Sequence, residues 1–162
     1  MKLITAINLK TINQLVSKPI KAGLYCMLFW LTTLSTAAHA ENMKSMGSMD
    51  IHYMAIGATF LTPSIAKAYG IERSKYNALI NISVLDNSQP NKPAKSVSVS
   101  GTAENLTGQF KRLDFEEVKE GSAIYYLAQL NYRDKESIKF EVSVTDGKET
   151  HTIKFNQTFY VD

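Results

Sequence analysis

Methionines surround one histidine in the stretch "MKSMGSMDIHYM", which covers residues 43–54. The candidate metal ligands within it are Met46, Met49, His52 and Met54. Thioether sulfurs and an imidazole are soft ligands, and they suit Cu(I) better than zinc or magnesium. One functional hypothesis is therefore a protein that binds copper or a similar metal through these side chains.

The spacing of these residues limits the metal hypothesis. Side chains alternate between the two faces of an extended strand, so His52 and Met54 share a face that Met49 does not. Met43 and Met46 reach His52 only if the segment before the strand folds back, which costs conformational entropy. The other interpretation is that the methionines are adaptable apolar residues on a tail and a strand edge. We assign no cofactor and keep metal binding as the alternative function.

A second group of side chains suited to binding lies in "AYGIERSK", residues 68–75. Here Tyr69, Arg73 and Lys75 combine an aromatic ring with two cations, as protein-binding surfaces and anion contacts often do. The other interpretation is structural. Arg73 would bond backbone carbonyls or a carboxylate and Tyr69 would pack on a sheet, because a short helix needs such anchors.

Motifs for catalysis are absent after residue 40. The two histidines there, His52 and His151, are far apart in the chain, and no G-x-S-x-G, H-E-x-x-H or phosphate-binding glycine loop occurs. The adjacent Glu116 and Glu117 face opposite ways on a predicted strand. We expect no catalytic residues and no enzyme. An enzyme whose site is assembled from distant residues is the third alternative.

The elements that position these side chains are predicted to be β-strands, because apolar and polar residues alternate along most of the chain from Met49 onward. The clearest alternation covers residues 137–146, and the Asp146-Gly147 pair at its end is a strong hairpin signal. The predicted strands are 50–60, 75–86, 95–104, 108–121, 123–132, 137–146 and 151–161.

One segment breaks the alternation and predicts a short helix over about residues 63–69. Thr62 suits the N-cap, Pro63 suits the first helical position, and Gly70 suits the left-handed residue that ends a helix. A helix of this length is not stable alone, so it must pack on the sheet between strands one and two.

These elements predict an all-β fold of about seven strands, namely an antiparallel β-sandwich of immunoglobulin-like size with one short helix. A partly open barrel is the alternative. We expect a single domain over 49–162, preceded by a flexible tail over 41–48, because that stretch is polar and lacks a period.

The first 40 residues have the organisation of a cleavable signal peptide. Four lysines and an apolar run over 24–34 precede Ala38 and Ala40, which form an A-x-A-like cleavage site. Cleavage is expected after Ala40. The run is shorter than the roughly 20 residues of a membrane-spanning helix, so we expect no stable membrane insertion after cleavage. A retained membrane anchor is the alternative.

Composition narrows the possible partners. The single cysteine, Cys26, lies in the leader, so the mature chain has no disulfide and no thiolate site. Without the four leader lysines, 14 basic residues stand against 15 acidic residues, which gives a net charge of −1. This balance lacks the basic footprint of a nucleic-acid-binding protein. We expect a monomer that binds no nucleic acid.

The segments "IHY" and "TFLTPSIAKAYGIERSKYNALINISVL" resemble the signature of domain-of-unknown-function family 4426, a family of small exported gammaproteobacterial proteins. The resemblance covers about 49–162 and is most specific at Leu61, Pro63, Ala66, Tyr69-Gly70-Ile71, Arg73-Ser74 and Asn81. It implies a periplasmic location, and it implies no activity or cofactor. The methionine run is not part of the signature.

The sequence therefore predicts an exported periplasmic β-sandwich that acts as a binding or accessory interaction module. Its expected partner is another periplasmic protein.

Overall fold

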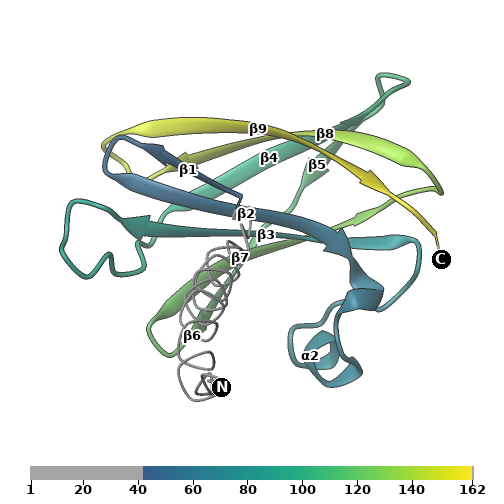
Figure 1. Cartoon of the computed structure of the whole chain (residues 1–162), viewed down its shortest axis with the longest axis horizontal. Coiled ribbons are helices and arrows are strands. Elements are labelled where there is room, and N and C mark those ends of the chain that lie inside the picture. Colours follow the sequence, from purple (N-terminus) through teal and green to yellow (C-terminus); the bar gives the residue numbers. More distant parts are fainter. Residues whose placement is uncertain (1–41, 162) are drawn as a thin grey trace, which may run out of the picture. The chain divides into compact units, whose positions relative to one another are not determined.

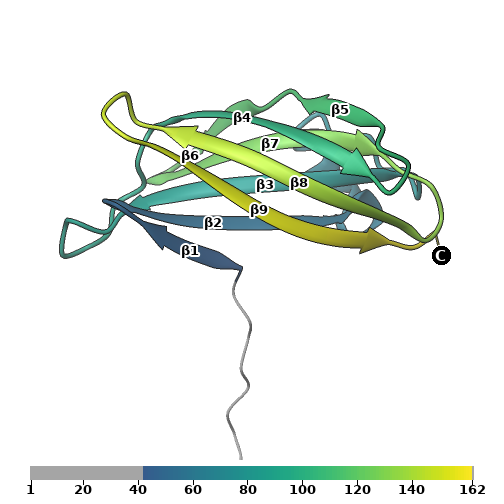
Figure 2. The ribbon, with the colours of Figure 1, turned by 90° about the horizontal axis from the view of Figure 1, so that it is seen from above.

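Two antiparallel sheets pack face to face in the computed structural model, which describes residues 42–161 (Figures 1 and 2). The prediction of an all-β sandwich is confirmed. The predicted signal peptide, residues 1–40, lies outside the described residues.

Nine strands make up the two sheets over the described residues. The five-stranded sheet contains, in order, β1 (Met43–Met46), β2 (Met49–Gly57), β3 (Asn77–Asp86), β7 (Ala123–Asn131) and β6 (Glu116–Glu120). The four-stranded sheet contains, in order, β5 (Phe110–Leu113), β4 (Ser98–Asn105), β8 (Glu136–Thr145) and β9 (Thr150–Phe159).

The core lies between the sheets and follows the alternation of the sequence. Ile80 and Ile82 of β3 and Phe140 and Val142 of β8 have no solvent exposure. Phe140 also stacks on Phe155 of β9, with ring centroids 4.9 Å apart. Each such side chain contributes about 1.5–3 kcal/mol through burial, so the core holds the two sheets together without a disulfide.

The prediction of a flexible tail over 41–48 is wrong for the described part of that segment. Met43–Met46 forms β1, which pairs antiparallel with the start of β2. Gly47 adopts a φ of +56° in the tight turn between them, and Ser45 Oγ donates to Asp50 Oδ1 at 2.6 Å. Backbone pairing and this polar bond stabilise a strand that carries almost no apolar alternation.

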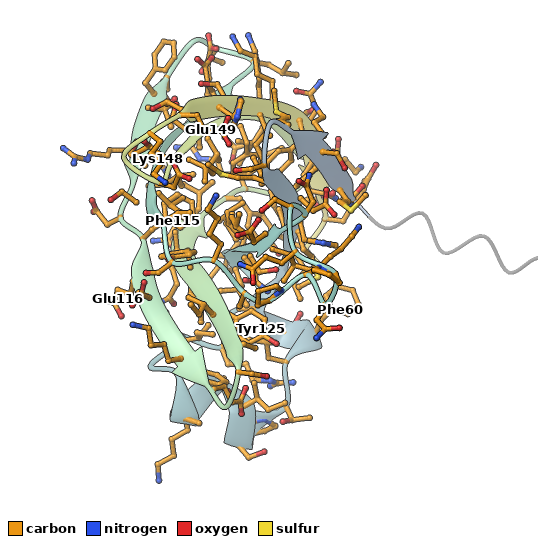
Figure 3. The ribbon with its side chains drawn as sticks, turned by 90° about the vertical axis from the view of Figure 1, so that its left-hand side faces the viewer. Phe60, Phe115, Glu116, Tyr125, Lys148 and Glu149 are labelled. Carbon is orange, nitrogen blue, oxygen red and sulfur yellow. The ribbon has the colours of Figure 1, made fainter. Side chains whose placement is uncertain are left out.

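The predicted strand over 108–121 is in fact two strands in different sheets. The chain leaves β5 after Leu113 and enters β6 at Glu116, so it crosses the sandwich within two residues (Figure 3). Leu113 is buried and Phe115 packs against the core from this crossing. Together with β1, this division explains why nine strands are found where about seven were predicted.

The short helix forms as predicted, as α2 (Pro63–Ala68). The Oγ1 of Thr62 accepts a hydrogen bond from Ile65 N at 3.3 Å, and Ala66 is buried with Leu79 of β3. The helix therefore covers the outer face of the five-stranded sheet near one end of the sandwich (Figure 1).

A polar network closes the other end of the sandwich. Lys95 Nζ, in the loop after β3, lies 2.7 Å from Asp146 Oδ2 and donates to Ser48 Oγ at 2.8 Å. Glu149 Oε1 accepts from both the backbone N and the Oγ of Ser48, at 2.9 and 2.6 Å. The turns β1–β2 and β8–β9 and the β3–β4 loop are thereby joined to one another.

Candidate functional site

Two of the three side chains predicted to bind a partner make contacts within the fold. Arg73 Nε donates to Leu61 O at 2.9 Å, and its Nη2 donates to Thr59 O at 3.2 Å. Tyr69 packs beside α2, and a hydrogen bond with Glu120, together with burial, raises the pKa of its phenol. These contacts anchor the helical connection between β2 and β3.

Lys75, the third of these side chains, lies apart from the other two. Its Nζ is 5.4 Å from the centroid of the exposed Tyr76 ring. Lys75 also contributes to the wall of a pocket at the end of the sandwich opposite the polar network. Of the three predicted binding residues, Lys75 therefore lies at a pocket, whereas Arg73 and Tyr69 stabilise the helical connection between β2 and β3.

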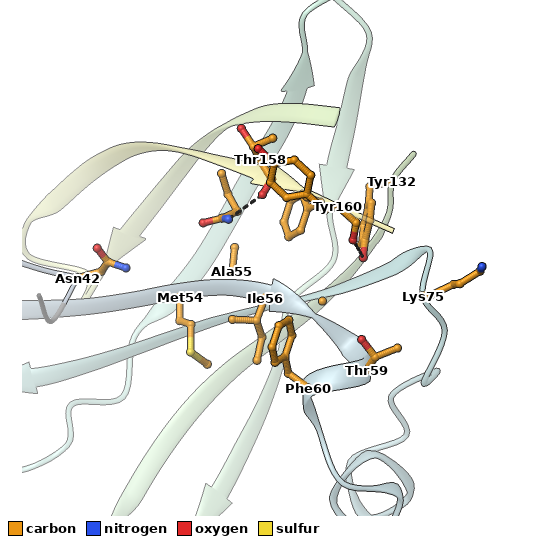
Figure 4. A pocket seen from close by; sticks show the side chains of 13 residues that line it. Asn42, Met54, Ala55, Ile56, Thr59, Phe60, Lys75, Tyr132, Thr158 and Tyr160 are labelled. Carbon is orange, nitrogen blue, oxygen red and sulfur yellow. Dashed lines mark hydrogen bonds between the residues drawn. The ribbon is translucent and has the colours of Figure 1, made fainter. Parts of the chain in front are cut away.

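This pocket has a volume of about 420 Å³ and lies between the last residues of β2 and those of β9 (Figure 4). We call it the edge pocket. Its walls include Met54–Gly57, Phe60, Lys75, Tyr132 and Gln157–Tyr160. Asn42, just before β1, also lines the pocket, so five separate segments of the chain meet around it.

Among residues 42–161, no strand pairs with the last part of β2 on the side of the edge pocket. β3 pairs with β2 along its whole length, but the register with β1 ends at Met43 and His52. Tyr53 N donates to Asn42 O at 2.9 Å, so the N–H of Tyr53 points away from β3. Because these groups alternate along an antiparallel strand, the N–H and C=O of Ala55 point the same way, past the end of β1.

The second wall of the edge pocket is also a sheet edge. β9 is the last strand of the four-stranded sheet, and over the described residues only β8 pairs with it. Proteins usually protect open edges with charges, prolines or bulges. Here the flanking side chains are aromatic: Phe60 is 77% exposed and Tyr160 is 60% exposed.

The base of the edge pocket is held by packed aromatic rings. Tyr132 stacks on Phe159 with centroids 4.6 Å apart, and its Oη donates to Tyr160 O at 3.4 Å. A Cβ on Gly57 would come within 3.2 Å of Tyr132 Oη, so the backbone of β2 approaches this ring closely. The exposed aromatics therefore stand on a rigid base.

The predicted metal ligands are divided between the two faces of the five-stranded sheet. Met49 is fully buried in the core and Met46 packs against it. His52 and Met54 lie on the outer face, as predicted from their spacing. Met43, on β1, is the direct register partner of His52.

No group of three or more His, Cys, Asp or Glu side chains is arranged to hold a metal ion within residues 42–161. Within the same range, no helix is long and apolar enough to cross a membrane.

Sequence reasoning missed two residues that the structure makes prominent. Phe60 and Tyr160 looked like ordinary apolar members of strands, and no local signal marks them as the rim of a pocket. Met43 was considered as part of a tail that folds back onto His52. The Gly47-Ser48 pair before the predicted strand is a two-residue hairpin signal that could have indicated this pairing.

Comparisons with known proteins agree with this fold. A family model described as "Domain of unknown function (DUF4426)" matches residues 43–162. A crystal structure of a DUF4426 family protein from Pseudomonas aeruginosa PAO1 is 32% identical to this chain, with a TM-score of 0.66. The match covers 77% of this chain and 98% of that protein. No curated protein matches the chain.

Two structures of FetP from uropathogenic Escherichia coli strain F11 are more distantly similar. A copper-bound variant is 12% identical with a TM-score of 0.52, covering 76% of this chain and 92% of FetP. The protein "as isolated" after recombinant expression in the E. coli periplasm is 10% identical with a TM-score of 0.52, covering 74% and 93%. At these identities, the similarity shows a shared fold.

Proposed function

The chain belongs to the DUF4426 family, as its resemblance to that family predicted, and we propose that it is an exported binding module without catalytic activity. Its binding site is the edge pocket. Its ligand is an extended segment of a partner polypeptide, which adds to the open edge of β2 as a further strand.

The open backbone of β2 beside exposed aromatic rings is the observation that carries this proposal. An extended peptide that adds to a sheet edge gains affinity from main-chain hydrogen bonds and specificity from pockets for alternate side chains. The N–H and C=O of Ala55 would make the main-chain hydrogen bonds, and the edge pocket would hold a side chain of the peptide. Phe60 and Tyr160 add exposed aromatic area of the kind that dominates binding energy.

The pocket also indicates the chemistry of the bound segment. An apolar side chain fits between the aromatic rings of Phe60 and Tyr132, since both line the pocket. Lys75 contributes a positive charge to the wall. We therefore expect the partner segment to carry an apolar residue and, near it, an acidic residue.

Two observations support a periplasmic location for this module. The first 40 residues have the features of a cleavable signal peptide. The fold is also that of FetP, a protein that has been expressed in the periplasm. The predicted partner is accordingly another periplasmic protein.

A proline substitution tests the proposed strand addition. Short random peptides displayed on phage are selected on the wild-type protein, and the affinities of the selected peptides are measured. Ala55→Pro removes an N–H that faces away from β3, so it should preserve the β2–β3 pairing and the fold. It should weaken peptide binding by roughly tenfold or more, as should Phe60→Ser.

A matched control separates the pocket from other apolar surface. Leu106 is 86% exposed in a loop outside the edge pocket, and Leu106→Ser should leave peptide binding unchanged. Peptides made with N-methylated amides at alternate positions should also lose affinity. Selected peptides that bind Ala55→Pro and Phe60→Ser as tightly as the wild type would overturn the proposal.

A further inference from the structure

The pairing of β1 with β2 brings soft side chains together on the outer face of the five-stranded sheet. Met43 and His52 are direct register partners. Because Tyr53 N donates to Asn42 O, the neighbouring Met43–His52 pair is the non-hydrogen-bonded kind. Such pairs have Cα atoms about 4.5 Å apart and the closest side chains in an antiparallel ladder.

Met54 completes the group. It lies two residues after His52 on the same face, at a strand distance of about 7 Å, and diagonally across from Met43. Met43 is 40% exposed and Met54 is 38% exposed, so both flexible thioethers have room to turn toward the imidazole. Three soft donor atoms can therefore converge on one ion.

We propose that Met43, His52 and Met54 form a binding site for Cu(I). Two thioether sulfurs and one imidazole nitrogen are a donor set that favours a soft, monovalent ion over zinc, calcium or magnesium. The site goes beyond the peptide-binding function, and it uses a different set from the one predicted from sequence. Met46 and Met49 drop out because their side chains lie on the core face.

The register partners of His52 and Met54 on β3 carry no carboxylate. Ser83 and Asn81 of β3 are the register partners of His52 and Met54. Asp50 is the carboxylate on this face of β2, but its Oδ2 accepts from Lys92 Nζ at 2.8 Å. Its Oδ1 accepts from Ser45 and Asn87. Both oxygens of the Asp50 carboxylate are therefore already engaged in hydrogen bonds.

Asn81 adds a second observation at the same place. Its Oδ1 is buried and has no hydrogen-bond partner among the described residues. Metal-binding histidines commonly donate their other ring N–H to a carboxylate, a carbonyl or a water, and an amide oxygen is an acceptor of the same kind. An acceptor for the second N–H of a metal-bound His52 is thus already on the same face of the sheet.

A copper competition measurement tests the site. Protein recovered from the periplasm of an expressing bacterium is titrated with Cu(I), kept reduced by ascorbate, against a chromophoric Cu(I) chelator. We expect one bound Cu(I) per chain. Met43→Leu, Met54→Leu and His52→Gln should each weaken binding by roughly tenfold or more.

Met46→Leu is the matched control, because Met46 is on the same strand as Met43 but its side chain packs against the core. It should leave the copper affinity unchanged. X-ray absorption at the copper edge of the wild-type protein should show two sulfur ligands and one nitrogen ligand, a result that does not depend on any variant folding. Equal losses for Met46→Leu and Met43→Leu, a copper ion without sulfur ligands, or no retained copper would overturn the proposal.

Discussion

At the scale of single residues, Arg73 shows how a side chain suited to binding is used to hold the fold. Its guanidinium donates to two backbone carbonyls, that of Thr59 within the 3₁₀ turn Ala58–Phe60 and that of Leu61 directly after it. This turn carries Phe60 to the rim of the edge pocket. Arg73 therefore acts on the pocket through the backbone that positions its wall.

Replacing Arg73 should destabilise the protein. Arg73→Ala removes two charge-assisted hydrogen bonds at an exposed site, and we expect a loss of about 1–2 kcal/mol in the free energy of unfolding. Arg73→Lys should recover only part of it, because an ammonium lacks the planar fork that reaches both carbonyls. Urea denaturation measures both variants. Unchanged stability of Arg73→Ala, combined with loss of peptide binding, would instead place Arg73 in the binding surface.

At the scale of elements, the β1–β2 hairpin depends on one glycine. Gly47 has a φ of +56°, and a Cβ there would overlap Glu149 Oε2 and lie 2.7 Å from His151 Nε2. Glu149 would have to give up its hydrogen bonds to Ser48, bonds that also lower the pKa of the Glu149 carboxyl. The hairpin and the β8–β9 turn are thus coupled at this contact.

Comparing two glycine substitutions isolates that contact. Gly121 has nearly the same φ, +58°, with open space around the position of a Cβ. Both Gly47→Ala and Gly121→Ala should cost about 1–2 kcal/mol for the left-handed backbone. Gly47→Ala should cost about 1 kcal/mol more, because Glu149 loses its bonds to Ser48. Equal unfolding free energies for the two variants would show that the contact adds nothing.

The elements that the sequence predicted well are those with strong local signals. The alternation in 137–146 and the Thr62 cap determine β8 and α2 with little help from the rest of the chain. β1 was missed because "MKSM" has no apolar face, and it is a strand only because β2 offers a backbone to pair with. The crossing between β5 and β6 was missed because both halves alternate, and only the tertiary fold assigns them to different sheets.

The candidate sites were less predictable than the strands, for a related reason. The alternation of a strand correctly placed His52 and Met54 on one face. Met43 lies beside His52 because of the register in which β1 pairs with β2. The edge pocket forms because the ends of β2 and β9, which belong to different sheets, lie next to each other. The residue types in the sequence predict neither the register of two strands nor the packing of two sheets.

At the scale of the whole molecule, the two ends of the sandwich differ in chemistry. One end is closed by ion pairs and hydrogen bonds among three connections, with Lys95 and Asp146 at the centre. That pairing raises the pKa of Lys95 and lowers that of Asp146, so both stay charged around neutral pH. At the other end, no strand among residues 42–161 pairs with the free edges of β2 and β9, and exposed aromatic rings flank them. A closed polar end and an aromatic end suit a rigid frame that binds the proposed partner segment at the aromatic end.

The most direct test of strand addition is amide hydrogen exchange at Ala55, measured by NMR with and without a selected peptide. The free protein should exchange Ala55 N–H faster than Ile56 N–H, because the Ile56 N–H points toward β3. Peptide binding should slow exchange at Ala55 by roughly tenfold or more and leave Ile56 nearly unchanged. A bound peptide that leaves the exchange rate of Ala55 unaltered would contradict the proposed function.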